Sequence, residues 1–255
     1  MITSKANDKV KMVTALVKDA NERRSAGIFV VEGARMASEV PAEMAVETYV
    51  SESFLSKNEI PTNLASAEVT EVSDEVFAKM SDTKNPQGIM VLVKMPTVSI
   101  SDMLSGKPLI ILEGIQDPGN LGTMLRTGEA AGIGGIIADK STVDAFNPKV
   151  IRSTMGAIFR VPLFVASDLA KIVDEVKGAG YTVYAAHLKG EDIYEGELAG
   201  KSAFLIGNEG NGLSDEISSL SDKLIRIPME GAVESLNASI CAGLLAYEWR
   251  RQHSK

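Results

Sequence analysis

The sequence predicts an α/β protein with a larger C-terminal domain, a mostly parallel sheet with helices on both faces, preceded by a smaller α/β domain. From residue 109 onward, short apolar runs alternate with glycine-rich loops and helical patterns, a rhythm typical of a parallel sheet covered on both faces. The length of 255 residues leaves room for two modest domains. The content of 45% hydrophobic and 24% charged residues is the balance of a globular protein with a packed core.

In the first hundred residues, the predicted elements are short. Apolar residues at helical spacing predict a helix over residues 10–21. A second helix is expected over residues 73–80, where Ser73 can serve as the N-cap and two acidic residues follow it. Short apolar runs predict strands at residues 28–31, 46–50 and 89–93.

A domain boundary is expected between residues 95 and 108, where two prolines and a glycine interrupt the pattern. We therefore expect domains at residues 1–95 and 108–255, joined by a linker at residues 96–107. Beyond the linker, strands are expected at residues 109–112, 135–138, 182–186, 203–206 and 224–227, and helices at residues 120–131, 147–157, 168–178 and 235–252. Asn120 and Ser235 are the expected N-caps of two of these helices.

The composition excludes several classes of protein and site. Cys241 is the only cysteine, so a disulfide within the chain and a metal site built from several cysteines are excluded. Two histidines are too few for a histidine-rich metal centre. The apolar runs are too short to cross a bilayer, and the first residues lack the apolar core of a signal peptide. We therefore expect a cytoplasmic protein.

The charge is unevenly distributed along the chain. A net charge of -8 and a pI near 5.0 argue against a protein that coats nucleic acid without specificity. Residues 1–24, however, hold six basic and three acidic side chains, an excess of +3. This segment predicts either a local basic face that binds nucleic acid or a solvated helix surface, and the sequence favours neither.

Three segments of the second half carry polar residues and glycines that packing does not explain. Residues 117–132 follow a strand and open a helix, where free N–H groups favour an anionic ligand. They do not match G-x-G-x-x-G, so a dinucleotide-binding fold is not indicated. Residues 204–214 run from an apolar strand into three glycines interspersed with polar residues, and glycine lets a backbone approach a ligand closely. In residues 227–243, Asn237 is a poor helix former in the first helical turn, so we expect it to bond another group.

In this order and spacing, the three segments resemble the motifs of the SpoU (TrmH-like) family of RNA ribose 2'-O-methyltransferases, within the SPOUT superfamily. The motifs read N-x-G-x-x-x-R-T at residues 120–127, G-N-E-G-x-G at residues 207–212 and I-P-M-x-G-x-x-x-S-L-N at residues 227–237. The N-terminal part resembles the family's RNA substrate-binding domain of L30e-like fold, on residues 29–35 and 81–89. The resemblance implies a C-terminal trefoil knot and a homodimer.

The resemblance also implies the reaction, which is methyl transfer from S-adenosylmethionine to a ribose 2'-hydroxyl without a metal. Arg126 corresponds to the catalytic arginine of the family. A guanidinium stays protonated in proteins and is a poor base, so stabilisation of developing negative charge is the favoured role, and proton acceptance stays open. The other catalytic residues implied by the resemblance are Asn120, Glu209, Ser235 and Asn237.

For the methyl donor, the resemblance implies a pocket formed largely by main-chain groups. Gly207, Ile227 and Leu236 match the family's donor-binding positions, and Leu205 is expected to pack against the adenine. Ala186 belongs to a loop that forms a further wall by a looser match, and the adjoining His187 is equally consistent with a surface histidine.

For the RNA, the expected contacts come from basic side chains of the N-terminal domain, namely Lys9, Lys11, Arg23, Arg24 and Arg35. The two-domain layout resembles that of ribosomal RNA methyltransferases, with transfer RNA as the alternative substrate.

The last helix carries a candidate partner surface of small residues, which intramolecular packing explains equally well. These residues are Ala238, Ala242, Gly243 and Ala246. Two rival hypotheses remain. A non-enzymatic RNA-binding dimer is tested by titration with the methyl donor, and a nucleotide-dependent enzyme such as a dehydrogenase is tested by titration with a nicotinamide cofactor.

Overall fold

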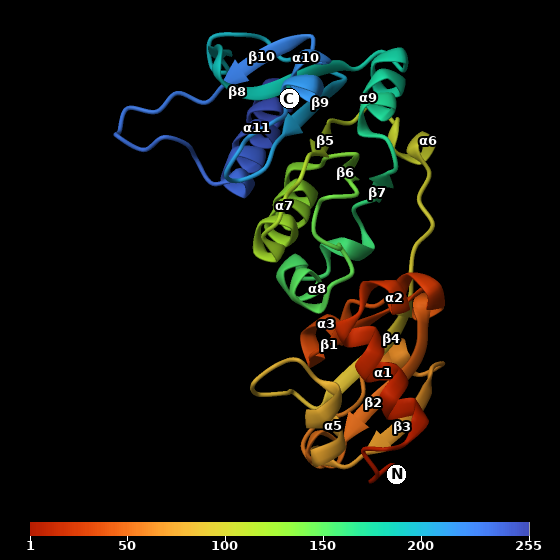
Figure 1. Ribbon diagram of the computed structural model, residues 1–255. Helices are drawn as coiled ribbons and strands as arrows, with labels where there is room; N and C mark the ends of the chain where they lie inside the picture. The colour runs from red at the N-terminus through yellow and green to blue at the C-terminus, as the bar shows by residue number, and fades with distance from the viewer. Residues whose placement is uncertain (255) are drawn as a thin grey trace. The chain divides into compact units, whose positions relative to one another are not determined.

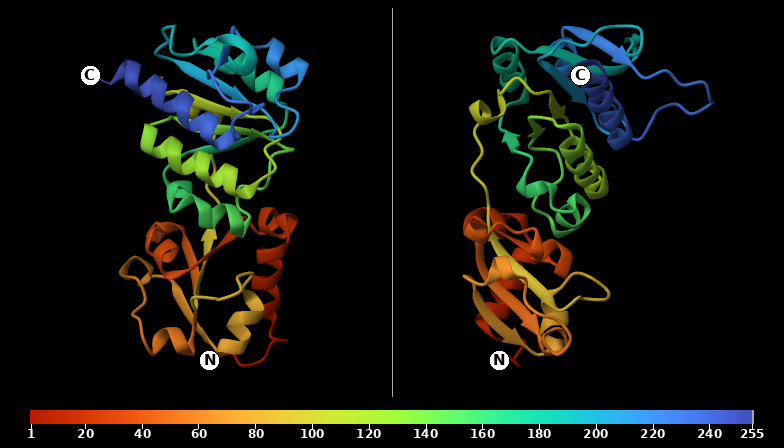
Figure 2. Two further views of the ribbon diagram at one scale, coloured as in Figure 1. Left: turned by 90° about the vertical axis from the view of Figure 1, so that its left-hand side faces the viewer. Right: turned by 180° about the vertical axis from the view of Figure 1, so that it is seen from behind.

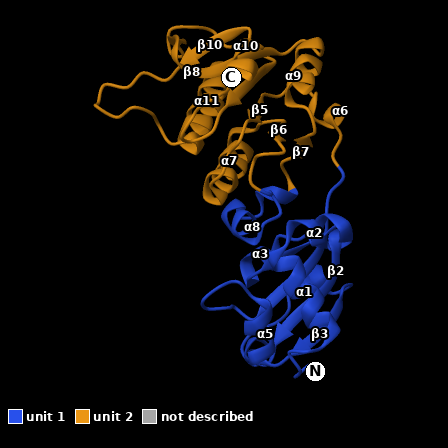
Figure 3. Cartoon of the chain, viewed as in Figure 1, with its two compact units in different colours: residues 1–97, 144–159 blue, residues 98–143, 160–255 orange. Residues whose placement is uncertain are grey.

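The computed structural model describes residues 1–254 (Figure 1). The chain forms two compact units: unit 1 comprises residues 1–97 and 144–159, and unit 2 comprises residues 98–143 and 160 onward (Figure 3). Among the described helices, none has both the length and the apolar character needed to span a membrane.

Unit 1 is a four-stranded sheet with helices on it. The strands follow the order β1-β4-β2-β3, in which β4 is antiparallel to both neighbours and β2 is parallel to β3. They are β1 (Ile28–Glu32), β2 (Ala45–Ser51), β3 (Glu68–Val72) and β4 (Ile89–Lys94). The α-helices are α1 (Asp8–Lys18), α2 (Ala20–Ala26), α3 (Ala34–Ser38), α4 (Glu52–Leu55), α5 (Asp74–Met80) and α8 (Pro148–Thr154), and the short 3-10 turns are η1 (Ala42–Met44), η2 (Thr62–Leu64) and η3 (Ala157–Phe159).

The two faces of this sheet are covered by different parts of the chain. Val30 belongs to the core cluster formed with α1 and α5. Phe29 precedes it on β1 and points to the opposite face, because side chains alternate along a strand. There the ring centroid of Phe29 lies 4.9 Å from that of Phe146 and 6.2 Å from that of Phe159. Residues 144–159 therefore complete the core of unit 1 and do not belong to the C-terminal domain, where their sequence position predicts them.

Unit 2 is a six-stranded parallel sheet of order β10-β8-β9-β5-β6-β7. Its strands are β5 (Leu109–Leu112), β6 (Gly135–Asp139), β7 (Leu163–Ala166), β8 (Thr182–Asp192), β9 (Ser202–Ile206) and β10 (Lys223–Arg226). Its helices are α6 (Ile100–Met103), α7 (Pro118–Ala131), α9 (Leu169–Gly178), α10 (Asp215–Ser219) and α11 (Ala238–His253). The predicted α/β class with a mostly parallel sheet is confirmed.

Helices cover both faces of the unit 2 sheet. On one face, α7 and α11 pack side by side, as Figure 2 shows on the left. On the other face, residues of α9 and α10 join the core formed by β5, β6, β8 and β9. The expected linker differs from the structure, because residues 100–103 form α6 and Met103 is fully buried in this core.

Candidate functional site

The candidate site lies at the carboxyl edge of the unit 2 sheet. β5 is where the strand order reverses, with β6 and β7 on one side and β9 and β8 on the other. Ligands of open parallel sheets bind beyond the carboxyl ends of the strands at such a point. The first motif lies in α7, which follows the loop after β5, and the second motif forms the loop after β9.

A chain of hydrogen bonds joins one residue from each motif. The Asn120 amide donates to the Glu209 carboxylate at 2.9 Å, and the Asn237 amide donates to the Asn120 oxygen at 2.9 Å. The Asn237 oxygen in turn accepts from the main-chain N–H groups of Ser239 at 2.8 Å and Ile240 at 3.3 Å, at the start of α11. We call Asn120, Glu209 and Asn237 the polar network.

Glu209 is ionised within this network. Burial alone would raise the pKa of its carboxyl group, but hydrogen bonds from Asn120 and from the main-chain N–H groups of Gln116 and Asp117 outweigh burial and lower the pKa below its usual value. The two main-chain bonds are 3.1 and 3.2 Å long. The carboxylate therefore fixes the loop that leads into α7.

Both helix caps differ from the prediction by a few residues. α7 begins at Pro118 with Asp117 as its N-cap, since proline fits a first helical position and the Asp117 carboxylate accepts from the Asn120 N–H. This leaves the Asn120 side chain free for the polar network. α11 begins after Asn237, which is its N-cap, because the amide oxygen of Asn237 satisfies the first free N–H groups of the helix.

Two predicted catalytic residues lie outside the polar network. Arg126 is exposed on α7, and its side chain makes no hydrogen bond or ion pair within residues 1–254. Ser235 is exposed in the segment between β10 and α11, which extends away from the sheet in Figure 1. Neither side chain is used to hold the fold, so both are available to a substrate.

Gly207 is required by the local backbone. Asn208 and Gly212 form a tight hairpin, with N–H to O distances of 3.0 and 2.9 Å between them. A Cβ atom on Gly207 would lie 2.1 Å from backbone atoms of Gly212 and Leu213. Any side chain at this position would displace the hairpin, which carries Glu209.

The predicted donor-binding residues are only partly brought together. Gly207 and Ile227 directly follow β9 and β10, the two parallel strands that flank β8. Ala186 differs from the prediction, because it lies within β8 and not in a loop. Leu236 is half-buried in the segment before α11. Leu205 differs from the prediction, because it is fully buried in the core between the sheet and α9, where it cannot contact a ligand.

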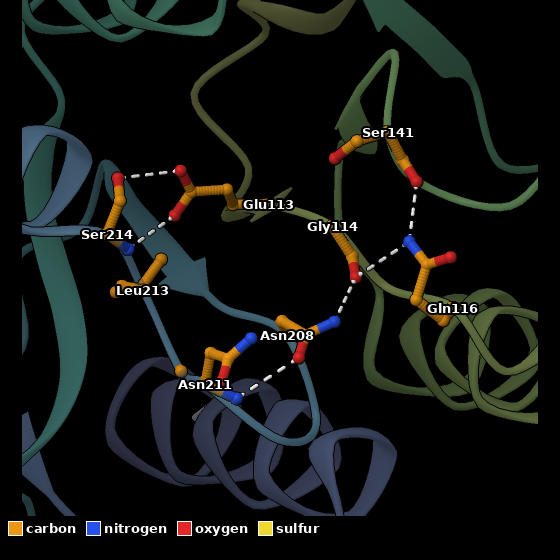
Figure 4. A pocket seen from close by; sticks show the side chains of 9 residues that line it. Glu113, Gly114, Gln116, Ser141, Asn208, Asn211, Leu213 and Ser214 are labelled. Carbon is orange, nitrogen blue, oxygen red and sulfur yellow. Dashed lines mark hydrogen bonds between the residues drawn. The ribbon is translucent and has the colours of Figure 1, made fainter.

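Sequence reasoning missed a set of residues that hold the loop after β5. Asp139, at the end of β6, accepts from the Gly114 N–H and the Thr142 N–H, both at 2.9 Å. Burial would raise the pKa of Asp139, but these bonds and those from the Ser141 and Thr142 hydroxyls lower it. The Glu113 carboxylate accepts from the Ser214 N–H at 2.8 Å and hydroxyl at 2.7 Å (Figure 4). Glu113 directly follows β5 and Asp139 is the last residue of β6, and a carboxylate at the end of a strand is the signal that could have revealed both.

The predicted RNA-binding residues of unit 1 fall into two groups. Arg23 is 2% exposed and donates to the Leu16 carbonyl at 2.7 Å and to the Asp144 carboxylate. It therefore stabilises unit 1 and is not available to RNA. Lys9 pairs with Glu47 and Glu68, and Lys11 pairs with Asp8, which offsets their charge.

Arg24 and Arg35 are exposed, and neither forms an ion pair within residues 1–254. They are the predicted RNA contacts that remain free to bind a phosphate. Within the same part of the chain, no group of three or more His, Cys, Asp or Glu side chains is arranged to hold a metal ion.

The polar network makes a testable contribution to stability. A carboxyl group whose pKa is lowered by folding stabilises the native state above its unfolded value, here 4.5, and that contribution is lost as the pH falls through the folded value. Glu209→Gln is therefore expected to be less stable than the parent at about pH 6, with a difference that shrinks toward about pH 3. Thermal unfolding across this range measures it. The control is Glu197→Gln, because Glu197 is exposed and its side chain has no partner within residues 1–254. A pH-independent difference for Glu209→Gln would contradict the prediction.

Known families and a curated relative match most of the chain. Residues 107–247 match the model of the SpoU rRNA Methylase family, and residues 7–91 match the MRM3-like substrate binding domain. The chain is 32% identical over 253 residues to the 23S rRNA (guanosine(2553)-2'-O)-methyltransferase RlmP of Bacillus subtilis, covering 98% of both chains.

Two solved structures are similar along the whole chain. The S-adenosylmethionine-bound rRNA methyltransferase of Sinorhizobium meliloti superimposes with a TM-score of 0.87 at 28% identity, over 100% of this chain and 98% of that one. The methyltransferase AviRb of Streptomyces viridochromogenes, at 24% identity, has the same fold, with a TM-score of 0.86 over 96% and 98% of the two chains.

Proposed function

Because the chain belongs to the SpoU rRNA methylase family, we propose that its site transfers a methyl group from S-adenosylmethionine to a ribose 2'-hydroxyl of large-subunit ribosomal RNA. The enzyme is an S-adenosylmethionine-dependent RNA 2'-O-methyltransferase. The observation that carries the proposal is the polar network, which joins one side chain from each family motif. A protein that only bound RNA would not require this arrangement.

The chemistry of the site rests on charge and positioning. The bound donor supplies a methyl group attached to a positively charged sulfur. We propose that the free guanidinium of Arg126 stabilises the negative charge that develops on the 2'-oxygen and positions the adjacent phosphate. The ionised Glu209 holds Asn120, and Asn120 holds Asn237. These bonds fix the start of α7 relative to the start of α11. Ser235 would close the site from the segment before α11.

For the donor, the main-chain groups around Ala186, Gly207, Ile227 and Leu236 are the proposed binding site. Gly207 and Ile227 come from the carboxyl ends of the strands on either side of β8, where a parallel sheet binds ligands, and Ala186 lies within β8 between them. The close backbone approach at Gly207 leaves no space for a side chain between the hairpin and the strand end. The threading of the C-terminal segment into a knot stays a prediction.

For the RNA, the match of residues 7–91 to a substrate-binding domain supports unit 1 as the module that holds the substrate. Arg24 and Arg35 are the proposed phosphate contacts, since their guanidinium groups are exposed and free of acidic partners. We propose that the reaction takes place in the cytoplasm, needs no metal and acts on ribosomal RNA, with transfer RNA as the alternative substrate.

A homodimer is proposed on the outer face of α11. The small residues Ala238, Ala242 and Ala246 are buried within the chain, and α11 packs against α7, so these residues do not form the free surface. The opposite face presents Ile240, Leu244 and Tyr247, which are 52%, 37% and 47% exposed. Their spacing of four and three residues places them on one stripe, which a second copy would cover.

Tyr247→Lys tests this surface. A lysine in the centre of an apolar interface would be buried without a partner, so we expect the dimer to dissociate at concentrations at least about tenfold higher than for the parent chain. Sedimentation velocity over a concentration series measures this. Tyr194→Lys changes a tyrosine of similar exposure, 49%, outside α11 and is expected to leave the dimer intact. Equal effects of the two variants would exclude this interface.

Methyl transfer from labelled S-adenosylmethionine to unmodified total RNA tests the function itself. We expect label in ribosomal RNA, at one ribose 2'-oxygen identified by mapping of the modified nucleotide. Label confined to transfer RNA would show that transfer RNA, and not ribosomal RNA, is the substrate. Donor binding without any methyl transfer would favour the hypothesis of a non-enzymatic RNA-binding protein.

A further inference from the structure

A pocket of about 300 Å³ lies between the loops that follow β5, β6 and β9 (Figure 4). None of the residues proposed above for catalysis or donor binding lines it. Its lining residues are Glu113, Gly114, Gln116, Ser141, Asn208, Asn211, Gly212, Leu213 and Ser214. Its volume is at the lower end of the range for small-molecule sites, so it suits one small group.

The polar groups that remain free in this pocket are mainly acceptors. Each Glu113 oxygen accepts one bond from Ser214, and a carboxylate offers about four acceptor sites in total. The Gln116 amide nitrogen donates to the carbonyls of Gly114 at 3.2 Å and Ser141 at 2.6 Å, which leaves its amide oxygen free. Asn211 makes no side-chain hydrogen bond to any described residue, so its amide can both donate and accept.

The pocket is unsuited to an anionic group. No lysine or arginine among the described residues lines it, and the nearby main-chain N–H groups of Ser214, Gly210 and Asn211 already donate to Glu113 or to Asn208. A phosphate, or the carboxylate of the methyl donor, would meet the Glu113 charge without a compensating cation. An adjoining pocket of about 310 Å³ shares Glu113 and Ser141 and adds the carboxylates of Asp139, Asp168 and Glu216 against Lys140. The ligand must therefore be uncharged and rich in hydrogen-bond donors.

Within an RNA, a nucleobase has these properties. Guanine presents a ring N–H, an amino group and a carbonyl along one edge, whereas adenine, cytosine and uracil each present fewer donor groups on that edge. Glu113 and the Gln116 oxygen can accept from the guanine donors, and the Asn211 amide can donate to its carbonyl. We propose that this pocket binds the base of the methylated nucleotide and selects guanine, an inference that rests on the proposed function.

Two residues that line the pocket are directly connected to Glu209 of the polar network. Gln116 lines the pocket with its side chain and donates its main-chain N–H to Glu209. Asn208, also in the lining, immediately precedes Glu209 and donates to the Gly114 carbonyl at 2.7 Å. A base held here positions its own ribose relative to the network, which lowers the entropic cost of reaction.

Nucleoside binding to the full-length protein tests the pocket independently of methyl transfer. Ligand-observed NMR with guanosine, inosine, adenosine, cytidine and uridine is expected to show the tightest binding for guanosine. Inosine, which lacks the amino group, is expected to bind about tenfold more weakly. Asn211→Ala and Glu113→Gln are each expected to weaken guanosine binding by about fivefold or more, with folding checked by circular dichroism, since Glu113 also holds Ser214. Asp174→Ala, on the exposed side of α9, is the control.

Equal affinity for all five nucleosides would overturn the selection of guanine. Guanosine binding that is unchanged in both variants would overturn the assignment of the pocket, as would a loss of S-adenosylmethionine binding in Asn211→Ala. Failure of the proposed function is distinguishable, because the wild-type protein would then transfer no methyl group to any RNA, whatever nucleoside it binds.

Discussion

Arg126→Ala is expected to lower the rate of methyl transfer by about 100- to 1,000-fold, the usual effect of removing one preorganised group from a developing oxyanion. The side chain is exposed and makes no bond within the described chain, so its removal leaves the fold intact. Initial rates with labelled donor measure the effect, and calorimetry is expected to show nearly unchanged affinity for S-adenosylmethionine.

Two further variants make the Arg126 result specific. Arg126→Lys keeps the charge but loses the planar fork of donors, so we expect an intermediate rate. Arg160→Ala removes another exposed guanidinium from unit 2, one that pairs with Glu129, and is expected to retain the parent rate within a fewfold. A rate of methyl transfer for Arg126→Ala within a fewfold of the parent rate would show that Arg126 is not a catalytic residue.

Arg23→Ala is expected to destabilise unit 1 by about 3–5 kcal/mol, the range for breaking a buried ion pair by removing one partner. The Arg23 guanidinium donates to the carbonyls of Leu16 and Val17 and to the carboxylate of Asp144, whose side chain is only 16% exposed. Removing it leaves a largely buried charge and two carbonyls without partners. Urea or thermal unfolding measures the loss.

The neighbouring residue provides the control for Arg23. The Arg24 side chain is exposed and, among residues 1–254, bonds only Asn21, at 3.3 Å. Arg24→Ala is therefore expected to change the free energy of unfolding by no more than about 0.5 kcal/mol. Arg24→Ala is nevertheless expected to weaken RNA binding, although the variant remains fully folded. Similar unfolding free energies for the two variants would contradict the structural role of Arg23.

Strands could be predicted from the sequence where burial on both faces requires a continuous run of apolar residues. β1, β4, β5, β6 and β9 are apolar runs covered on both faces, and each was expected within a residue or two. β3 was missed because it carries Glu68, Thr70 and Glu71 and is mostly exposed, so it has no apolar run. β7 was missed because it has only four residues, two of which are not buried. The helix expected at residues 147–157 ends at Thr154, since Met155 adopts a left-handed φ of 51°.

The sequence by itself determined the α/β class, the family resemblance and the identities of Asn120, Glu209 and Asn237, because motif residues and strand periodicity are local patterns. Only the tertiary structure decided that these three side chains bond one another, since they lie 89 and 117 positions apart along the chain. It also separated Arg23 from Arg24, two adjacent arginines that a charge count treats alike. Burial and partner geometry depend on how distant segments pack, as residues 144–159 do in unit 1, and no local pattern encodes that packing.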